Sequence, residues 1–187
     1  MPPLLHARDR LSRHPHRVGA LCFFLGLLAA LFVPRYPEPT PVWQTAHFAS
    51  NQGNGGFLWA GIGLLLLLAV KDASRAWAGC IARVMLVETV LVHLLKLATG
   101  PWLPRPSGGA GGFPSGHSAA AFALAFLLSE RFPRGAVVWY GIAAVIAWSR
   151  VAVNDHYAYQ VIGGMALGLA TALLLFDLSW RQRRKTG

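Results

Sequence analysis

Charged side chains are scarce in this sequence, and so are cysteines. Only 13% of the 187 residues are Asp, Glu, Lys or Arg, whereas a soluble domain carries about 25%. Cys22 and Cys80 both lie inside apolar runs, which excludes a disulfide framework and a cysteine metal site. Hydrophobic residues make up 55% of the chain. This balance excludes a disordered tail, argues against a water-soluble monomer and indicates a membrane protein of one domain.

Six apolar stretches are long enough, or nearly so, to cross a bilayer as helices, which takes roughly 20 residues. They are residues 18–33, 56–70, 77–97, 114–128, 136–153 and 157–178. The first resembles a signal-peptide core, but no small-x-small cleavage site precedes Pro34, so we expect it to be retained. The sequence therefore predicts an all-α fold, a six-helix transmembrane bundle that forms a single domain over residues 1–187.

The basic residues are distributed unevenly around these spans. Twelve of the 17 fall on one side of the predicted membrane. They are Arg8, Arg10, Arg13, Arg17, Lys71, Arg75, Arg131, Arg134, Arg181, Arg183, Arg184 and Lys185. Because cytoplasmic loops carry an excess of Lys and Arg, we expect this side to be cytoplasmic, with both basic tails, residues 1–17 and 181–187. Topology thus explains the net charge of +10, and we expect no nucleic acid as a partner.

Lys96, Arg105 and Arg150 lie on the opposite, extracytoplasmic face, against the positive-inside pattern. A single cation near a helix end is often explained by its side chain reaching for the interface. Three cations on the same face predict a site for an anion.

Three segments place polar residues on this outer face. Residues 96–106 read KLATGPWLPRP, residues 113–118 read FPSGHS, and residues 149–160 read SRVAVNDHYAYQ. Residues 107–112 join the first two segments and are rich in glycine. They lack the Gly-Lys-Ser/Thr ending of a nucleotide phosphate loop, so we expect a flexible hinge there.

These residue types suit the binding and transfer of a phosphoryl group. The planar guanidinium of arginine matches two phosphate oxygens. Ser115 and Gly116 follow Pro114 at a helix start, where backbone N–H groups and the helix dipole favour an anion. His117 and His156 are able to divide the roles of nucleophile and general acid.

Acidic residues are too few on this face for a hard metal ion. Of the seven Asp and Glu residues, only Glu38 and Asp155 fall in the predicted outer loops, whereas Mg²⁺ and Ca²⁺ take several oxygen ligands. Zinc held by His117, His156 and Asp155 would be opposed by the nearby cations. We therefore expect no metal and no cofactor.

The three segments, in this order, resemble the signature of the type 2 phosphatidic acid phosphatase superfamily: Lys-x6-Arg-Pro, then Pro-Ser-Gly-His, then Ser-Arg-x5-His-x3-Asp. The resemblance implies that His156 attacks phosphorus and forms a phosphohistidine, while His117 protonates the leaving oxygen. It also implies a set of phosphate-binding residues. These are Lys96, Arg105, Ser115, Gly116 and Arg150.

The chain departs from that signature at two places. Eight residues rather than six separate Lys96 from Arg105, so Lys96 is expected to lie deeper or to reach the site differently. Gln160 stands where the family has Asp. Its amide oxygen is able to accept the same hydrogen bond from His156, but it carries no charge. Gln160 therefore predicts a slower enzyme, a different relay or lost activity.

The resulting expectation is a metal-independent lipid phosphatase in the cytoplasmic (inner) membrane, whose active site faces the extracytoplasmic, periplasmic side. Its partners would be the bilayer and a phosphorylated lipid at the outer leaflet. A lipid-to-lipid phosphotransferase and a catalytically weakened anionic-lipid binding or transport protein remain alternatives. The sequence leaves the headgroup and the oligomeric state open. Residues 35–55 are expected to form the first outer loop and to select the headgroup. Glu88, in the third span, is expected to pair with Arg83 or with a polar neighbour on another span.

Overall fold

The structure, a computed structural model, describes residues 35–71 and 75–186, and all regular structure in these ranges is helical. The elements are α2 (Pro41–Phe48), the π-helical turn η1 (Ala49–Gly53), α3 (Asn54–Lys71), α4 (Arg75–Thr99), α5 (Gly116–Arg131), the 3₁₀ turn η2 (Pro133–Gly135), α6 (Ala136–Ala152) and α7 (Ala158–Thr186). The expected span over residues 18–33 and the tail over residues 1–17 lie outside the described residues. The all-helical class is confirmed for the described part of the chain, whereas the count of six spans and the cytoplasmic termini stay predictions.

Within the described residues, four helical stretches are long and apolar enough to cross a membrane. They are Pro41–Lys71, Trp77–Thr99, Pro133–Ala152 and Ala158–Phe176. Large apolar side chains remain exposed on their outer surfaces, among them Trp59, Leu67 and Leu97. Such surfaces suit contact with lipid hydrocarbon rather than with water.

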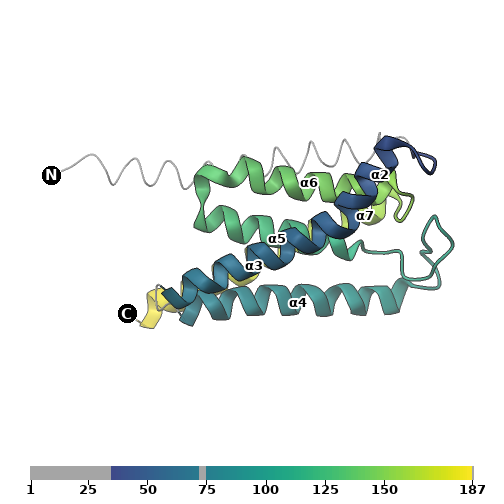
Figure 1. Cartoon of the computed structure of the whole chain (residues 1–187). Helices are drawn as coiled ribbons and strands as arrows, with labels where there is room; N and C mark the ends of the chain where they lie inside the picture. Colours follow the sequence, from purple (N-terminus) through teal and green to yellow (C-terminus); the bar gives the residue numbers. More distant parts are fainter. Residues whose placement is uncertain (1–34, 72–74, 187) are drawn as a thin grey trace.

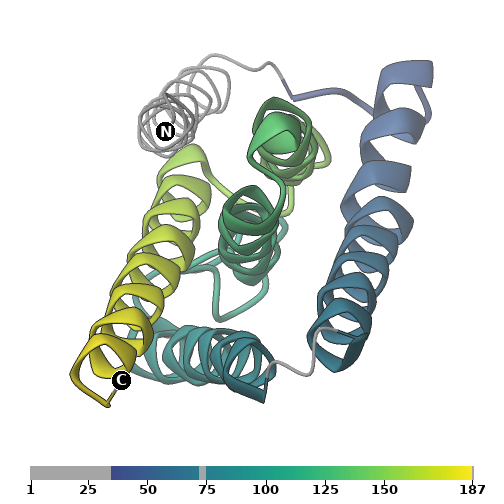
Figure 2. The same ribbon diagram turned by 90° about the vertical axis from the view of Figure 1, so that its left-hand side faces the viewer.

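Helix α5 occupies the middle of the bundle (Figures 1 and 2). Its 16 residues span roughly 24 Å, less than the roughly 30 Å of a bilayer's hydrocarbon core. Eleven of them are buried, because the helix is apolar on all faces and rich in alanine. The other helices surround α5, so its first turn is held rigidly at one end of the bundle.

The closest approach to α5 is made by α7 and depends on glycine. A Cβ atom at Gly164 would collide with the carbonyl of Ser115, and one at Gly168 would collide with the carbonyl of Ala119. Small residues at such positions let membrane helices pack backbone against backbone. This packing fixes the start of α7 against the start of α5.

Residues 35–55, the first outer segment, are more helical than the sequence suggested. We expected residues 35–55 to be a loop, but α2, η1 and α3 form one continuous helical stretch over Pro41–Lys71. Thr40 begins α2 by accepting a hydrogen bond from the backbone N–H of Trp43 at 3.2 Å. Only residues 35–40 remain non-helical, and η1 packs against α6.

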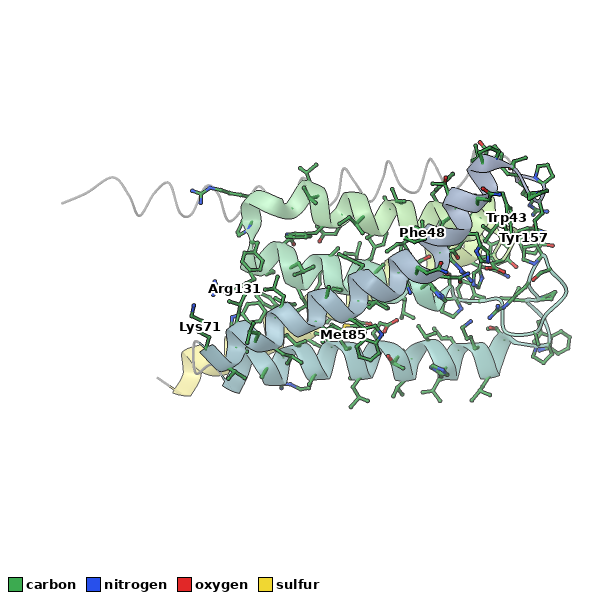
Figure 3. The ribbon with its side chains drawn as sticks, viewed as in Figure 1. Trp43, Phe48, Lys71, Met85, Arg131 and Tyr157 are labelled. Carbon is green, nitrogen blue, oxygen red and sulfur yellow. The ribbon has the colours of Figure 1, made fainter. Side chains whose placement is uncertain are left out.

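The two ends of the bundle differ in character. Lys71 and Arg131 lie at one end of the bundle, and Trp43 and Tyr157 lie at the other (Figure 3). The loop between α4 and α5 and the connection between α6 and α7 are also at the Tyr157 end (Figure 1). The three segments singled out in the sequence therefore meet at the end opposite Lys71 and Arg131.

Candidate active site

Gln160 joins two of the three segments through its side chain. Its Oε1 accepts hydrogen bonds from Nδ1 of His156 and from the backbone N–H of Tyr157, both at 3.1 Å. Its Nε2 donates to the carbonyl oxygen of Pro104 at 2.9 Å. A carbonyl only accepts and a backbone N–H only donates, so the two ends of the amide are assigned without ambiguity. Nδ1 of His156 therefore carries the proton, and Nε2 is left with its lone pair.

His156 is almost fully buried in the short connection between α6 and α7. Burial lowers the pKa of its imidazole from 6.5 to about 3, and the charge of Arg150 contributes in the same direction. The hydrogen bond to Gln160 opposes this shift only in part. The ring is therefore neutral at physiological pH, which is the state a nucleophile requires.

Arg150 lies in the last turn of α6, where its buried guanidinium contacts two polar side chains. Its Nη1 contacts the hydroxyl of Ser50 in η1, and its Nη2 lies 2.8 Å from Oδ2 of Asp155. Its Nε is buried and has no partner among the described residues. Nε of Arg105 is likewise buried and unpartnered within the described chain. Two guanidinium N–H groups in one site are thus left for an acceptor.

Lys96 lies one turn from the end of α4, and its ammonium group donates to the carbonyl of Gly111 at 2.8 Å. The expected hinge over residues 107–112 is a hydrogen-bonded loop instead. The backbone N–H of Arg105 donates to Gly109 at 2.7 Å, and that of Gly112 donates to Leu103 at 3.1 Å. Of the eight residues between Lys96 and Arg105, the first three complete α4 and the others belong to the folded loop. Lys96 contacts this same loop through Gly111.

The second segment begins α5 as expected, but one of its donors is already used. Ser115 is the residue before the helix, and its backbone N–H donates to the carbonyl of Gln160 at 2.9 Å. Our expectation that this N–H faces an anion is therefore wrong, because the start of α7 occupies it. The hydroxyl of Ser115 accepts a hydrogen bond from Ser118 at 3.0 Å. Gly116 packs closely against Val92 of α4.

His117, in the first turn of α5, is partly exposed. Electrostatic interactions connect it to Arg150, Asp155, Lys96 and Arg105. The same three cations act on His156. The two histidines and the three cations expected from the sequence are thus brought to one site from α4, α5, α6 and their connections.

Ser50 and the carbonyl of Pro104 are site groups that sequence reasoning missed. Ser50 is 100 positions from Arg150 and lies in no motif. The carbonyl of Pro104 could not be singled out, because every residue has a backbone carbonyl. Asp155 was considered only as a ligand in the rejected zinc site, but it pairs with Arg150. The described residues contain no group of three His, Cys, Asp or Glu side chains arranged to hold a metal ion.

The expected pair of Glu88 and Arg83 does not form. Glu88 is buried and accepts a 3.4 Å hydrogen bond from the hydroxyl of Thr89. Arg83 is exposed and donates to the carbonyl of Gly79 at 3.1 Å. The polar neighbour that Glu88 contacts is thus on its own helix, α4, and not on another span as expected.

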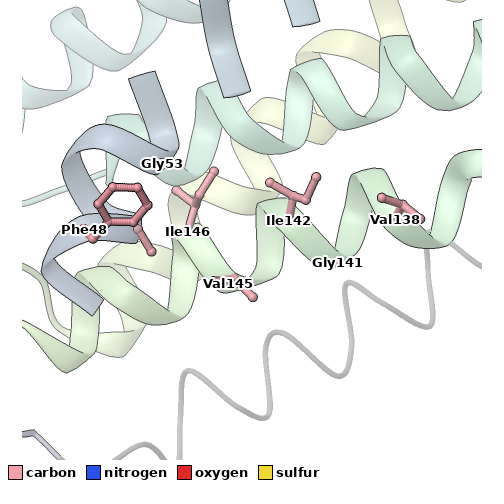
Figure 4. A pocket seen from close by; sticks show the side chains of 8 residues that line it. Phe48, Gly53, Val138, Gly141, Ile142, Val145 and Ile146 are labelled. Atoms are coloured by element: carbon pink, nitrogen blue, oxygen red, sulfur yellow. The ribbon is translucent and has the colours of Figure 1, made fainter. Parts of the chain in front are cut away.

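An apolar groove of about 420 Å³ adjoins the site between η1 and α6. Figure 4 shows Phe48 and Gly53 on one side of it and Val138, Ile142, Val145 and Ile146 of α6 on the other. One lining residue, Ala49, directly precedes Ser50 in the chain, and another, Ile146, lies one helical turn before Arg150.

The apolar helices and their buried polar end define a multi-pass helical membrane protein. The sequence model of the PAP2 superfamily matches residues 12–184, and the chain belongs to this superfamily. The resemblance inferred from the three segments is thereby confirmed.

Among the proteins similar to the chain are two relatives from bacteria and one solved structure. A lipid A 1-phosphatase from Porphyromonas gingivalis is 38% identical over 80 residues, which is 40% of this chain and 18% of that protein. An Escherichia coli protein provisionally named an undecaprenyl-diphosphatase is 40% identical over 63 residues, 33% of this chain and 31% of that protein. The matches therefore span less than a third of either relative.

The crystal structure of a transmembrane PAP2-type phosphatidylglycerolphosphate phosphatase from Bacillus subtilis has the same fold. It superposes with a TM-score of 0.60 over 92% of this chain and 96% of that chain, at 19% sequence identity. This likeness supports the helical arrangement across nearly the whole length.

Proposed function

We propose that the protein is a membrane lipid phosphatase that removes a phosphate from a phosphorylated lipid through a phosphohistidine at His156. The observation that carries the proposal is the hydrogen bond from Nδ1 of His156 to Gln160, which leaves Nε2 unprotonated beside the cations. The names of the two relatives support a lipid phosphate as the substrate class.

The substrate phosphate is held by fixed positive charge. Nε of Arg150 and Nε of Arg105 are buried donors without partners in the described chain, and Lys96 adds its charge. Phosphoryl transfer depends mainly on positioning and on neutralising the charge of the transferred group. Gly116 and the first turn of α5 contribute the positive end of a helix dipole. The hydroxyl of Ser115 completes the set of proposed phosphate contacts.

In the first step the lone pair of His156 Nε2 attacks phosphorus, and the bond between phosphorus and the lipid oxygen breaks. His117 takes up a proton when the phosphate anion binds and offsets the charge of the nearby cations. It donates this proton to the leaving oxygen, so the lipid leaves as an alcohol or as a shorter phosphate. In the second step a water attacks the phosphohistidine, and His117 takes its proton. Orthophosphate leaves, and His156 returns to its starting state. Gln160 keeps the imidazole oriented in both steps.

The apolar groove supports a substrate with a hydrocarbon chain. Its lining by Phe48, Val138 and Ile142 suits a lipid tail, and two further lining residues are close to Ser50 and Arg150 along the chain. A headgroup attached to a chain in this groove is therefore delivered to the guanidinium. Phosphatidic acid, phosphatidylglycerol phosphate, polyprenyl diphosphate and lipid A all have this form.

We further propose that the site faces the extracytoplasmic side of the cytoplasmic membrane, because Lys71 and Arg131 lie at the opposite end (Figure 3). A cysteine introduced at Ser107, which is exposed in the loop between α4 and α5, should react in intact cells with a membrane-impermeant maleimide. A cysteine at Lys71 should react only after the membrane is opened. The reverse pattern would place the site on the cytoplasmic side.

The proposed function is tested by phosphate release in proteoliposomes. The purified protein is supplied with each of the four lipids in excess EDTA, alongside His156→Ala. We expect release from at least one lipid by the wild type and none by the variant. If phosphate appears only when a divalent ion is restored, the metal-free mechanism is wrong. If label passes from one lipid to an added lipid acceptor rather than to water, the protein is a phosphotransferase. If no lipid is turned over, it is a lipid-binding or transport protein.

A further inference from the structure

Arg150 already has an anionic partner within the site proposed to bind phosphate. Asp155 Oδ2 lies 2.8 Å from Nη2 of Arg150, while Ser50 contacts Nη1. The backbone N–H groups of Asp155 and His156 both donate to the carbonyl of Arg150, at 3.1 and 3.0 Å. This tight turn after α6 holds the carboxylate close to the guanidinium.

The nitrogen held by Asp155 is one that a phosphate needs. Arginine binds two phosphate oxygens either through Nη1 and Nη2 or through Nε and Nη2, so each bidentate arrangement includes Nη2. In Arg150, Nε has no partner among the described residues, whereas Nη2 is paired with Asp155. A phosphate that binds Arg150 with two oxygens must therefore share Nη2 with the carboxylate or displace it.

Asp155 is also placed to leave and to influence the rest of the site. Its side chain is 33% exposed, whereas that of Arg150 is 5% exposed. The carboxylate is therefore able to turn toward solvent while the guanidinium stays in place. Its charge acts on His117 as well as on Arg150, so its effect reaches both sides of the phosphate position.

We propose that Asp155 is an internal competitor of the phosphate. It occupies Arg150 in the empty site, is displaced when a phosphate binds, and returns when the product orthophosphate leaves. The inference rests on the proposed function and deepens it. In this view Asp155 determines how tightly the site binds orthophosphate. Without this carboxylate, Lys96, Arg105 and Arg150 would retain the product more tightly.

The test is direct binding of orthophosphate to the purified, detergent-solubilised full chain by titration calorimetry, in EDTA and at fixed ionic strength. Asp155→Asn removes the charge and keeps the shape. We expect its Kd for orthophosphate to fall by about tenfold, because close charge pairs couple by about 1.5 kcal/mol or more. A tighter site is diagnostic, since damage to the fold weakens binding rather than strengthening it.

Three further variants make the result specific. Asp155→Ala removes the charge by a second route and should also lower Kd, and Asp155→Glu should bind as the wild type does. Glu38→Gln changes the net charge equally at an exposed acid on the same end of the chain and should leave Kd unchanged. Equal or weaker binding by both Asp155→Asn and Asp155→Ala, with unchanged unfolding temperatures, would overturn the inference.

The assay involves no turnover, so it separates this inference from the proposed function. A protein that binds orthophosphate more tightly as Asp155→Asn but releases phosphate from no lipid would refute the lipid phosphatase and support the competition. A protein that turns over lipid while Asp155→Asn and Asp155→Ala leave Kd unchanged would support the phosphatase and refute the competition.

Discussion

Gln160 and His156 are joined by a 3.1 Å hydrogen bond in which the imidazole Nδ1–H is the donor and the amide oxygen is the acceptor. The other end of the amide donates to the carbonyl of Pro104, which comes directly before Arg105. Gln160 therefore positions the proposed nucleophile and attaches it to the segment that carries a phosphate-binding cation. A carboxylate at the same place would have no proton to offer Pro104.

Replacing Gln160 separates these two tasks. Gln160→Ala removes the hydrogen bonds to His156 and to Pro104 together. We expect kcat to fall by about tenfold to a hundredfold, less than the roughly 10⁴-fold loss of a charged orienting group. Gln160→Glu keeps an acceptor for His156 but places an oxygen against the carbonyl of Pro104. We expect it to lower the unfolding temperature, which Gln160→Ala does to a smaller degree. Steady-state kinetics and thermal unfolding measure the two effects, and a Gln160→Glu variant as stable as the wild type would contradict this geometry.

Gly112 is predicted to be needed for the position of Gln160. A Cβ atom at residue 112 would lie 2.5 Å from Nε2 of Gln160 and 2.8 Å from the carbonyl oxygen of Pro104. Gly112→Ala should therefore displace the amide and lower kcat by about tenfold or more, as loss of a positioning contact does. Gly109→Ala is the matched control in the same loop, because its Cβ would meet only Arg105 Cδ at 3.6 Å. Equal kinetics for the two variants would show that the loop adjusts freely.

The imidazole of His156 should remain neutral at pH values well below the ordinary histidine pKa of 6.5. With its pKa lowered from 6.5 to about 3, the folded protein binds no proton there at pH 5, whereas the unfolded chain does. The linkage therefore reduces the stability of the folded state as pH falls from 6.5 toward 3. Nitrogen NMR of histidine-labelled protein, with His156→Ala for assignment, should show a proton on Nδ1 and no titration between pH 8 and pH 5. A midpoint near 6.5 would mean that His156 is solvated.

The contact between α5 and α7 should tolerate no side chain at Gly168. A methyl group there collides with the carbonyl of Ala119, and we expect Gly168→Ala to destabilise the fold by about 1–3 kcal/mol, as overpacking does. Gly141→Ala on α6 is the control, because nothing lies within 4 Å of its Cβ position. Thermal unfolding in detergent compares the two, and similar unfolding temperatures would mean that α7 moves away from α5 without loss.

The sequence was sufficient for features that depend on local pattern. Apolar length predicts the helices around residues 56–70, 77–97, 136–153 and 157–178, and the motif order predicts that His117, His156 and the three cations meet. The sequence was insufficient for contacts that depend on how segments far apart in the chain pack together. Ser50 reaches Arg150 only because η1 adds an extra residue per turn and packs on α6. Likewise, the backbone N–H of Ser115 donates to the carbonyl of Gln160. A contact between two backbone groups cannot be predicted from the residue types.

The most direct test of the central claim is to trap the phosphoenzyme. The purified protein, in EDTA, is mixed with the ³²P-labelled lipid that gives the fastest phosphate release, and the reaction is stopped in alkali, where phosphohistidine survives. Proteolysis and mass spectrometry then locate the label. The account predicts a phosphoryl group on His156 that forms and decays with turnover, and no labelled protein for His156→Ala. A label on another residue, or continued turnover by His156→Ala, would contradict it.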